Sequence, residues 1–130
     1  MEGRSRFAVI LGVSVALVAG VSQPAFAVKE FFDEFKAVYV KPDSSDANEK
    51  ALAAEVETAK CNVCHAGSSK KERNAYGNAL AELLDKKEDK KNVEKIRAAL
   101  DKVAAMPSAD GGPTFGDLIK QGKLPGGAAK

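Results

Sequence analysis

The chain has 130 residues, with 20 basic and 18 acidic side chains and a formal net charge of +2. This length leaves room for one small domain. The near balance of charge gives no support to nucleic-acid binding, which goes with a clear basic excess.

The first 27 residues have the order of a secretory signal peptide. Arg4 and Arg6 give a positive start, residues 7–21 form an apolar run, and small residues follow up to Ala27. The run is shorter than the roughly 20 residues that cross a bilayer as a helix. We therefore predict cleavage after Ala27 and a periplasmic or secreted mature chain. The alternative is an uncleaved N-terminal membrane anchor.

Five stretches of the mature chain carry helical periodicity, and none shows the alternation typical of a strand. The first helix is expected over residues 28–40, where aromatic side chains share one face, and Pro42 follows its end. The second is expected over residues 47–60. Asp46 is its predicted N-cap, and its C-terminal end runs into a cysteine-rich segment.

Three further helices are predicted downstream. Residues 71–85 and 92–106 carry apolar side chains at helical spacing, and Pro107 stops the second of these helices. Thr114 and Asp117 form an N-cap pair for a last short helix. The predicted fold class is therefore all-α, a compact bundle of four to five short helices.

Both cysteines and the only histidine lie within five consecutive positions, as Cys61, Cys64 and His65. The pattern C-x-x-C-H is the attachment motif for c-type haem. Two thiols three positions apart can each form a thioether with one vinyl group of a haem, and the adjacent imidazole then meets the iron. The predicted export agrees with this interpretation, because c-type haem is attached outside the cytoplasm.

Two other kinds of site use cysteines at this spacing. Thiol–disulfide redox proteins carry C-x-x-C beside a strand–helix pattern, and no such pattern is seen here. A structural zinc site needs four ligands, whereas this chain offers three candidates in one place. Haem attachment is the main prediction, and a dithiol redox protein or a zinc site are the alternatives.

The candidate ligand for the distal side of the iron is Met106, the only methionine of the predicted mature chain. Met106 ends an amphipathic stretch just before Pro107, and a thioether there could fold over the haem. Ligation by histidine and methionine raises the reduction potential. The alternative is that Met106 continues the apolar stripe of Leu100 and Val103 and packs in the core.

These segments resemble the small monohaem cytochrome c family of class I type. The resemblance covers roughly residues 46–124 and is carried by CNVCHAG, AMPSADGG and PTFGDLIKQG. It implies a helical fold around one covalently bound haem c and a role in electron transfer. It also implies Cys61 and Cys64 as attachment sites, with His65 and Met106 as axial ligands. The chain departs from the family in lacking a proline soon after the motif and in having the helix over 28–40.

The resulting prediction is a signal peptide over 1–27, a helical extension over 28–45, a cytochrome c-like haem domain over 46–124 and a flexible tail over 125–130. The chain would carry single electrons between larger redox proteins through transient docking, and it would not be an enzyme. The rival hypothesis is a five-coordinate haem protein that senses or binds a gas or another small ligand.

Two groups of residues beside the motif have open roles. The Tyr76 hydroxyl could lie near a haem propionate, or the ring could be ordinary core. Basic side chains flanking the motif could steer acidic redox partners or simply face solvent; they are Lys60, Lys70, Lys71 and Arg73. The charge run over residues 86–91 is expected to face solvent.

Overall fold

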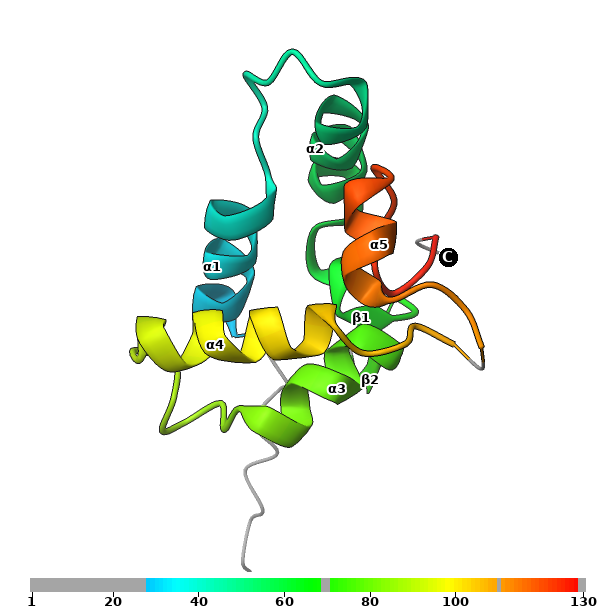
Figure 1. Ribbon diagram of the computed structural model, residues 1–130. Helices are drawn as coiled ribbons and strands as arrows, with labels where there is room; N and C mark the ends of the chain where they lie inside the picture. Colours follow the sequence, from blue (N-terminus) through cyan, green and yellow to red (C-terminus); the bar gives the residue numbers. More distant parts are fainter. Residues whose placement is uncertain (1–27, 69–70, 110, 129–130) are drawn as a thin grey trace, which may run out of the picture.

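The computed structural model describes residues 28–68, 71–109 and 111–128, so the predicted signal peptide lies outside the described residues. The described chain is mainly helical, as predicted, and contains the elements α1 (Lys29–Tyr39), α2 (Ala47–Ala59), η1 (Lys60–Val63), β1 (His65–Ala66), β2 (Glu72–Arg73), α3 (Ala75–Leu83), α4 (Val93–Ala104) and α5 (Phe115–Lys120) (Figure 1). The two short strands pair antiparallel and were not predicted. Within the described ranges, no helix combines the length and apolar character needed to cross a bilayer.

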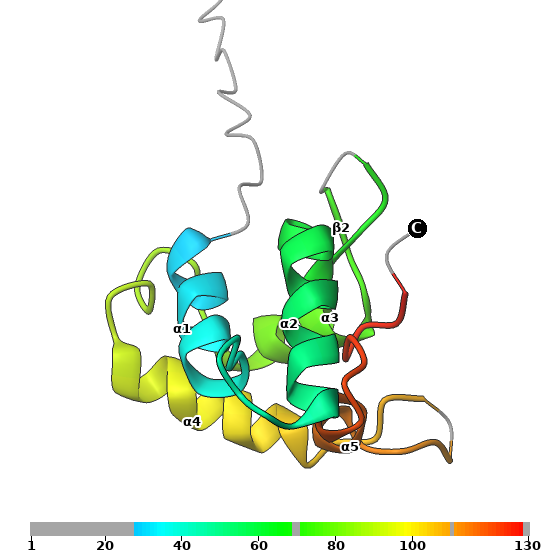
Figure 2. The ribbon, with the colours of Figure 1, turned by 90° about the horizontal axis from the view of Figure 1, so that it is seen from above.

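The helix α4 is the common packing partner of the fold. It contacts α1, α3 and α5, while α5 also contacts α2. Figures 1 and 2 place α1 over the N-terminal half of α4 and α5 at its C-terminal end. The amphipathic sequence of α4 explains this role, because Ile96, Leu100 and Val103 are all buried on one side of it.

The core joins α1 to the rest of the molecule. Phe35 of α1 is 1% exposed, and its ring centroid lies 5.8 Å from that of Tyr76 in α3. Tyr76 in turn lies 5.3 Å from Phe115 of α5. The segment 28–45, expected as an extension, therefore belongs to the same core as the segment that carries the motif.

The helix starts follow local side-chain chemistry. Asp46 accepts hydrogen bonds from Asn48 N and Glu49 N at 2.9 Å each, as predicted for the cap of α2. Thr114 and Asp117 form the predicted capping box of α5. The helix α3 is shorter than expected, because Asn74 caps it and residues 72–73 pair in the ribbon instead.

The C-terminal segment is packed where a flexible tail was predicted. Leu124 is 4% exposed, and the Pro125 side chain is fully buried. A methyl group at Gly126 would lie 2.0 Å from Asn74 Nδ2, so this backbone runs directly against Asn74. The expectation of a free tail from residue 125 is therefore wrong for its first residues, since burying Leu124 and Pro125 fixes the chain there.

Candidate functional site

The motif lies in a sharp turn between α2 and the ribbon. Lys60 ends α2 with φ at 50°, the left-handed region that side chains other than glycine rarely adopt. The turn η1 then carries Cys61, Cys64 follows it, and His65 opens β1. The three predicted site residues are thus held on a tightly wound segment that is anchored at both ends.

The ribbon orients the His65 ring. Residues His65 and Arg73 are paired across the strands, and His65 Nδ1 lies 3.1 Å from the carbonyl oxygen of Glu72. A carbonyl only accepts, so Nδ1 carries the proton and donates it to this bond. The other nitrogen, Nε2, then has a free lone pair, the state in which imidazole binds a metal. The Glu72 carbonyl thus holds the His65 ring in this orientation.

The helix α3 packs closely against the turn that carries the motif. A methyl group at Gly77 would lie 2.0 Å from the Cys64 carbonyl oxygen, so only glycine allows the helix to come this close. The Asn74 amide donates to the carbonyls of Asn62 at 3.2 Å and Val63 at 3.0 Å. Its oxygen accepts from Gly77 N at 2.9 Å. One side chain thus caps α3 and ties it to the turn that carries the cysteines.

The motif opens into a cavity of about 280 Å³, which we call the motif cavity. One wall holds both thiols and the imidazole, and most of the remainder is apolar. The lining residues are Val28, Phe31, Phe32, Cys61, Cys64, His65, Arg73, Gly77, Leu80, Ala81, Leu84, Asp85 and Lys86. The structure therefore brings Cys61, Cys64 and His65 together, with aromatic and aliphatic side chains in the same cavity.

The two thiols are free and half-buried. Burial raises the pKa of the Cys64 thiol to about 12, and the neighbouring Cys61 adds to this effect. Cys64 is therefore a neutral thiol at physiological pH.

The predicted distal ligand lies elsewhere. Met106 follows the end of α4, is 36% exposed and is not among the residues that line the motif cavity. Its backbone bonds to Val103 and Phe115, at 2.9 and 3.0 Å. The alternative of core packing is wrong, because the adjacent bridge between Pro107 and Thr114 leaves the side chain at the surface. Iron ligation by Met106 stays a prediction.

The Tyr76 hydroxyl is buried without a partner. The residue is 0% exposed, and among the described residues its oxygen has no hydrogen bond. Burial raises the pKa of Tyr76 well above its usual value, and Cys64 contributes next. A buried unpaired hydroxyl destabilises a fold by about 1–3 kcal/mol.

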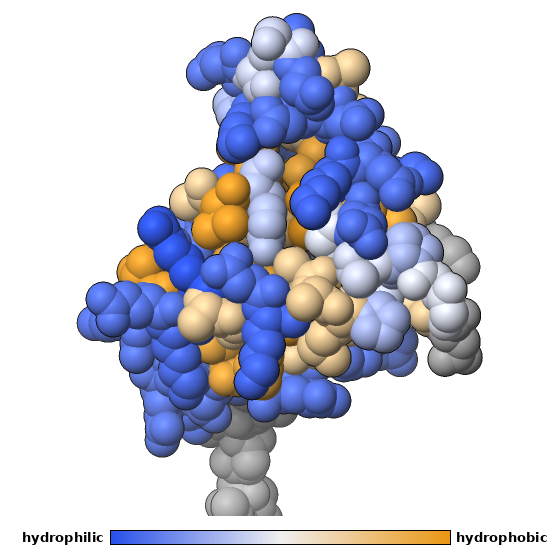
Figure 3. Space-filling model, viewed as in Figure 1, coloured by the Kyte–Doolittle hydropathy of each residue, from blue (hydrophilic) through white to orange (hydrophobic). Residues whose placement is uncertain are grey.

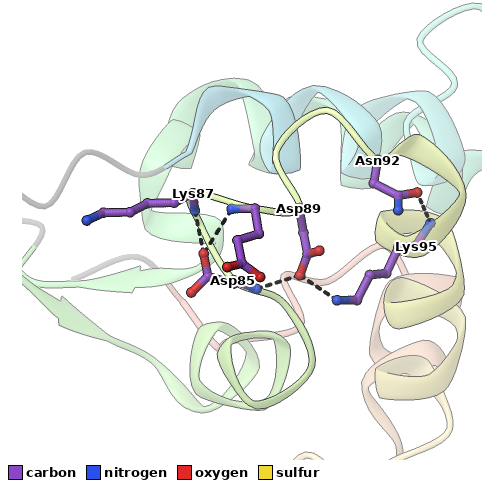
Figure 4. Close-up of polar contacts among 6 residues, drawn as sticks. Asp85, Lys87, Asp89, Asn92 and Lys95 are labelled. Carbon is purple, nitrogen blue, oxygen red and sulfur yellow. Dashed lines mark hydrogen bonds and ion pairs between the residues drawn. The ribbon is translucent and has the colours of Figure 1, made fainter.

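The loop from α3 to α4 forms part of the cavity rim and is fixed by Asp89 (Figure 4). This carboxylate is 6% exposed, although it lies in a run predicted to face solvent. It accepts from Asp85 N at 2.8 Å and from Lys95 Nζ at 2.7 Å. The bonds hold Asp85 in place beside Lys86, whose side chain contributes charge to the rim.

The basic residues that flank the motif in the sequence differ in whether they line the motif cavity. Arg73 lines the motif cavity and is exposed. Lys60 and Lys71 are exposed but do not line it, and Lys70 lies outside the described residues. These residues therefore do not form a continuous ring of positive charge around the cavity, because Asp85 lies on the same rim as Arg73.

A second cavity of about 470 Å³ lies between α1, α2, α4 and α5. Its lining residues are Val38, Tyr39, Lys41, Glu49, Leu52, Asp101, Ala104, Ala105, Thr114, Gly116, Ile119 and Lys120. Figure 3 shows apolar surface in the middle of the face between these helices, framed by polar side chains. This second cavity is lined by neither cysteine nor histidine.

Sequence reasoning missed Glu72, Asn74 and Gly77 as supports of the motif. Asn74 and Gly77 could have been identified from the sequence. Asparagine is a preferred N-cap, and an isolated glycine inside a helical pattern often marks close packing. The Glu72 carbonyl left no signal, because any residue type supplies a backbone oxygen.

The geometry of the described residues does not support the zinc alternative. In the part of the chain that the structure describes, no three side chains among His, Cys, Asp and Glu are grouped so as to hold a metal ion.

Comparisons with family models, curated proteins and solved structures found no match for this chain. The function is therefore inferred from the residues of the motif cavity themselves.

Proposed function

We propose that the mature chain is a monohaem c-type cytochrome that carries single electrons between larger redox proteins. The observation that supports it is the motif cavity, where Cys61, Cys64 and His65 meet apolar walls. Cys61 and Cys64 would hold the haem through thioethers, and His65 would bind the iron through Nε2. A bound haem supplies a one-electron couple between ferrous and ferric iron.

The surrounding residues fit such a group. Phe31, Phe32 and Leu80 line the cavity, and the apolar shell around an iron site controls its access to solvent. The Glu72 carbonyl keeps the His65 proton on Nδ1. The unpaired Tyr76 hydroxyl is a further polar group, near Cys64, that lacks a partner in the chain alone.

The cellular setting belongs to the same proposal. Cleavage after Ala27 would release a periplasmic or secreted chain, where c-type haem is attached. We propose a carrier and not an enzyme, with transient docking to donor and acceptor proteins. Such encounters use small interfaces. The mixed charge of Arg73, Asp85 and Lys86 beside the cavity suits docking without a strong preference for one sign of charge.

A five-coordinate haem protein that binds or senses a gas is the second candidate. The observation that favours it is the position of Met106, which is exposed and outside the motif cavity. If no other ligand reaches the distal face of the iron, a small ligand would find an open position there. The coordination state separates the two candidates.

The first experiment is expression of the full chain with the c-type haem maturation machinery, followed by a spectrum in alkaline pyridine. We expect the band of a haem with two thioethers. Cys61→Ser and Cys64→Ser should each shift it to the position for one thioether, and the double variant should lose covalent haem. Met106→Ala is the control that leaves attachment intact. Absence of covalent haem from the wild type would overturn the proposal.

The spectrum of the native protein then decides between carrier and sensor. A low-spin ferric spectrum, and a ferrous form that binds carbon monoxide slowly, support the carrier. A high-spin ferric spectrum with fast binding of carbon monoxide supports the five-coordinate protein.

A further inference from the structure

The motif cavity includes the residue that the predicted cleavage would make N-terminal. Val28 directly follows Ala27 in the sequence, and it lines the same cavity as Cys61, Cys64 and His65. Phe31 and Phe32, one turn further along α1, line it as well. Cleavage after Ala27 would therefore give a free α-amino group to a residue that lines the cavity of the motif.

The local backbone leaves this nitrogen available. Val28 precedes α1, and its carbonyl accepts from Phe31 N at 3.0 Å and Phe32 N at 3.4 Å. These bonds fix the orientation of Val28 on the helix. Its own nitrogen donates to none of the described residues. The carbonyl is thus used by the helix, while the amine is not.

Besides the thiols and His65, the cavity is lined by the Lys86 amine and by the Asp85 carboxylate, which already accepts from Lys87 N at 2.7 Å and Glu88 N at 2.9 Å. Lys86 carries an amine, but an ordinary lysine has a pKa of about 10.4, whereas an α-amino group has one of about 7.7–8.0. Far more of the α-amine is unprotonated at neutral pH, and the positive end of the α1 dipole favours that neutral form further. Arg73 stays protonated, and Met106 lies outside the cavity.

We propose that the α-amino nitrogen of Val28 is the sixth ligand of the iron, on the side opposite His65. The proposal rests on the proposed function and on cleavage after Ala27. It explains how a six-coordinate carrier can form while Met106 stays at the surface. Signal-peptide removal would then complete the metal site, and the two nitrogen ligands would give a lower potential than histidine and methionine.

The test uses a precursor with an enterokinase recognition sequence inserted between Ala27 and Val28. Signal cleavage leaves this short extension on the folded holoprotein, and enterokinase then removes it so that Val28 becomes the N-terminus. Mass spectrometry checks each N-terminus and the single haem. We expect a high-spin ferric spectrum and fast binding of carbon monoxide before cleavage. After cleavage the spectrum should become low-spin, and the fast carbon monoxide binding should be lost.

The controls separate this inference from the proposed function. The same extension appended after Lys130 should leave the low-spin spectrum unchanged, and so should Met106→Ala and Lys86→Ala. The inference is overturned if enterokinase leaves the spectrum unchanged, if the wild-type protein starts at another residue, or if Met106→Ala alone gives the high-spin form. In all three cases covalent haem in the pyridine spectrum still supports the proposed function, whereas its absence removes both.

Discussion

The motif cavity and the second cavity lie at opposite ends of α1 and differ in whether their polar groups have partners among the described residues. In the second cavity, Tyr39 donates its hydroxyl to the Leu100 carbonyl at 3.2 Å, and Lys41 pairs with Glu49 at 2.8 Å. The motif cavity is smaller and holds free thiols and an imidazole nitrogen that has no partner among the described residues. Size alone would select the second cavity, whereas reactive groups without partners select the motif cavity, where we propose that the cofactor binds.

Two buried or half-buried tyrosines show the same contrast. The Tyr39 hydroxyl has an acceptor within the chain, but the fully buried Tyr76 hydroxyl has none among the described residues. Native structures pair nearly all buried polar groups, and exceptions concentrate where a ligand completes the site. The two hydroxyls thus differ in whether the described chain supplies a partner.

The largest effect is expected from Gly77→Ala. A methyl group there would lie 2.0 Å from the Cys64 carbonyl oxygen, so α3 or the motif turn must move. Overpacking of this kind costs about 3 kcal/mol of folding free energy. Urea unfolding measures it. Gly112→Ala is the control, because its methyl group would have nothing closer than 3.6 Å. Equal stability of the two variants would contradict the close approach of α3 to the motif.

Asn74→Ala should be the next most severe change. It removes the cap of α3 and leaves the carbonyls of Asn62 and Val63 without their donor. The expected loss is about 2 kcal/mol in urea unfolding. Asn92→Ala removes only a cap, at the exposed start of α4, and should cost about 1 kcal/mol. A smaller loss at Asn74 than at Asn92 would argue against its bridging role.

The matched pair Tyr76→Phe and Tyr39→Phe should change stability in opposite directions. Without haem, Tyr76→Phe removes an unpaired buried hydroxyl and should stabilise the chain by about 1 kcal/mol. Tyr39→Phe removes a hydrogen bond and should destabilise it by about 0.5–1 kcal/mol. Chemical denaturation of both variants tests this. If Tyr76→Phe destabilises only the haem-loaded protein, the hydroxyl has gained a partner from the bound group.

The smallest effect is a pH dependence at the cavity rim. Hydrogen bonds from Lys95 and from the Asp85 backbone hold the pKa of Asp89 below its usual value. A carboxylate with a lowered pKa stabilises the fold above its unfolded pKa of about 3.9, and this contribution is lost as pH falls toward the folded pKa.

Asp89→Asn should therefore lower the Tm at pH 7, and the difference from wild type should shrink as the pH falls below about 4. Thermal melts across this range measure it. The exposed Asp43 provides the control substitution, Asp43→Asn. A difference that stays constant with pH would show that the ion pair does not stabilise the loop.

The sequence by itself determined the features that depend on neighbouring residues. Capping at Asp46 and Thr114 follows from side chains that bond to backbone two or three positions away. The apolar faces of α2 and α4 follow from helical spacing, and C-x-x-C-H carries its chemistry in five positions. Each of these interactions lies within one or two helical turns, so the sequence already contains both partners.

The tertiary structure alone decided the features that join distant segments. It placed the Glu72 carbonyl on His65, buried Asp89 within a charged run, and left Met106 at the surface. It also brought Val28 to the cavity of the motif. Such pairings arise when the faces of several helices pack together, and many arrangements would bury the same apolar residues. Local patterns therefore predicted the chemistry of the site, and packing determined which distant groups surround it.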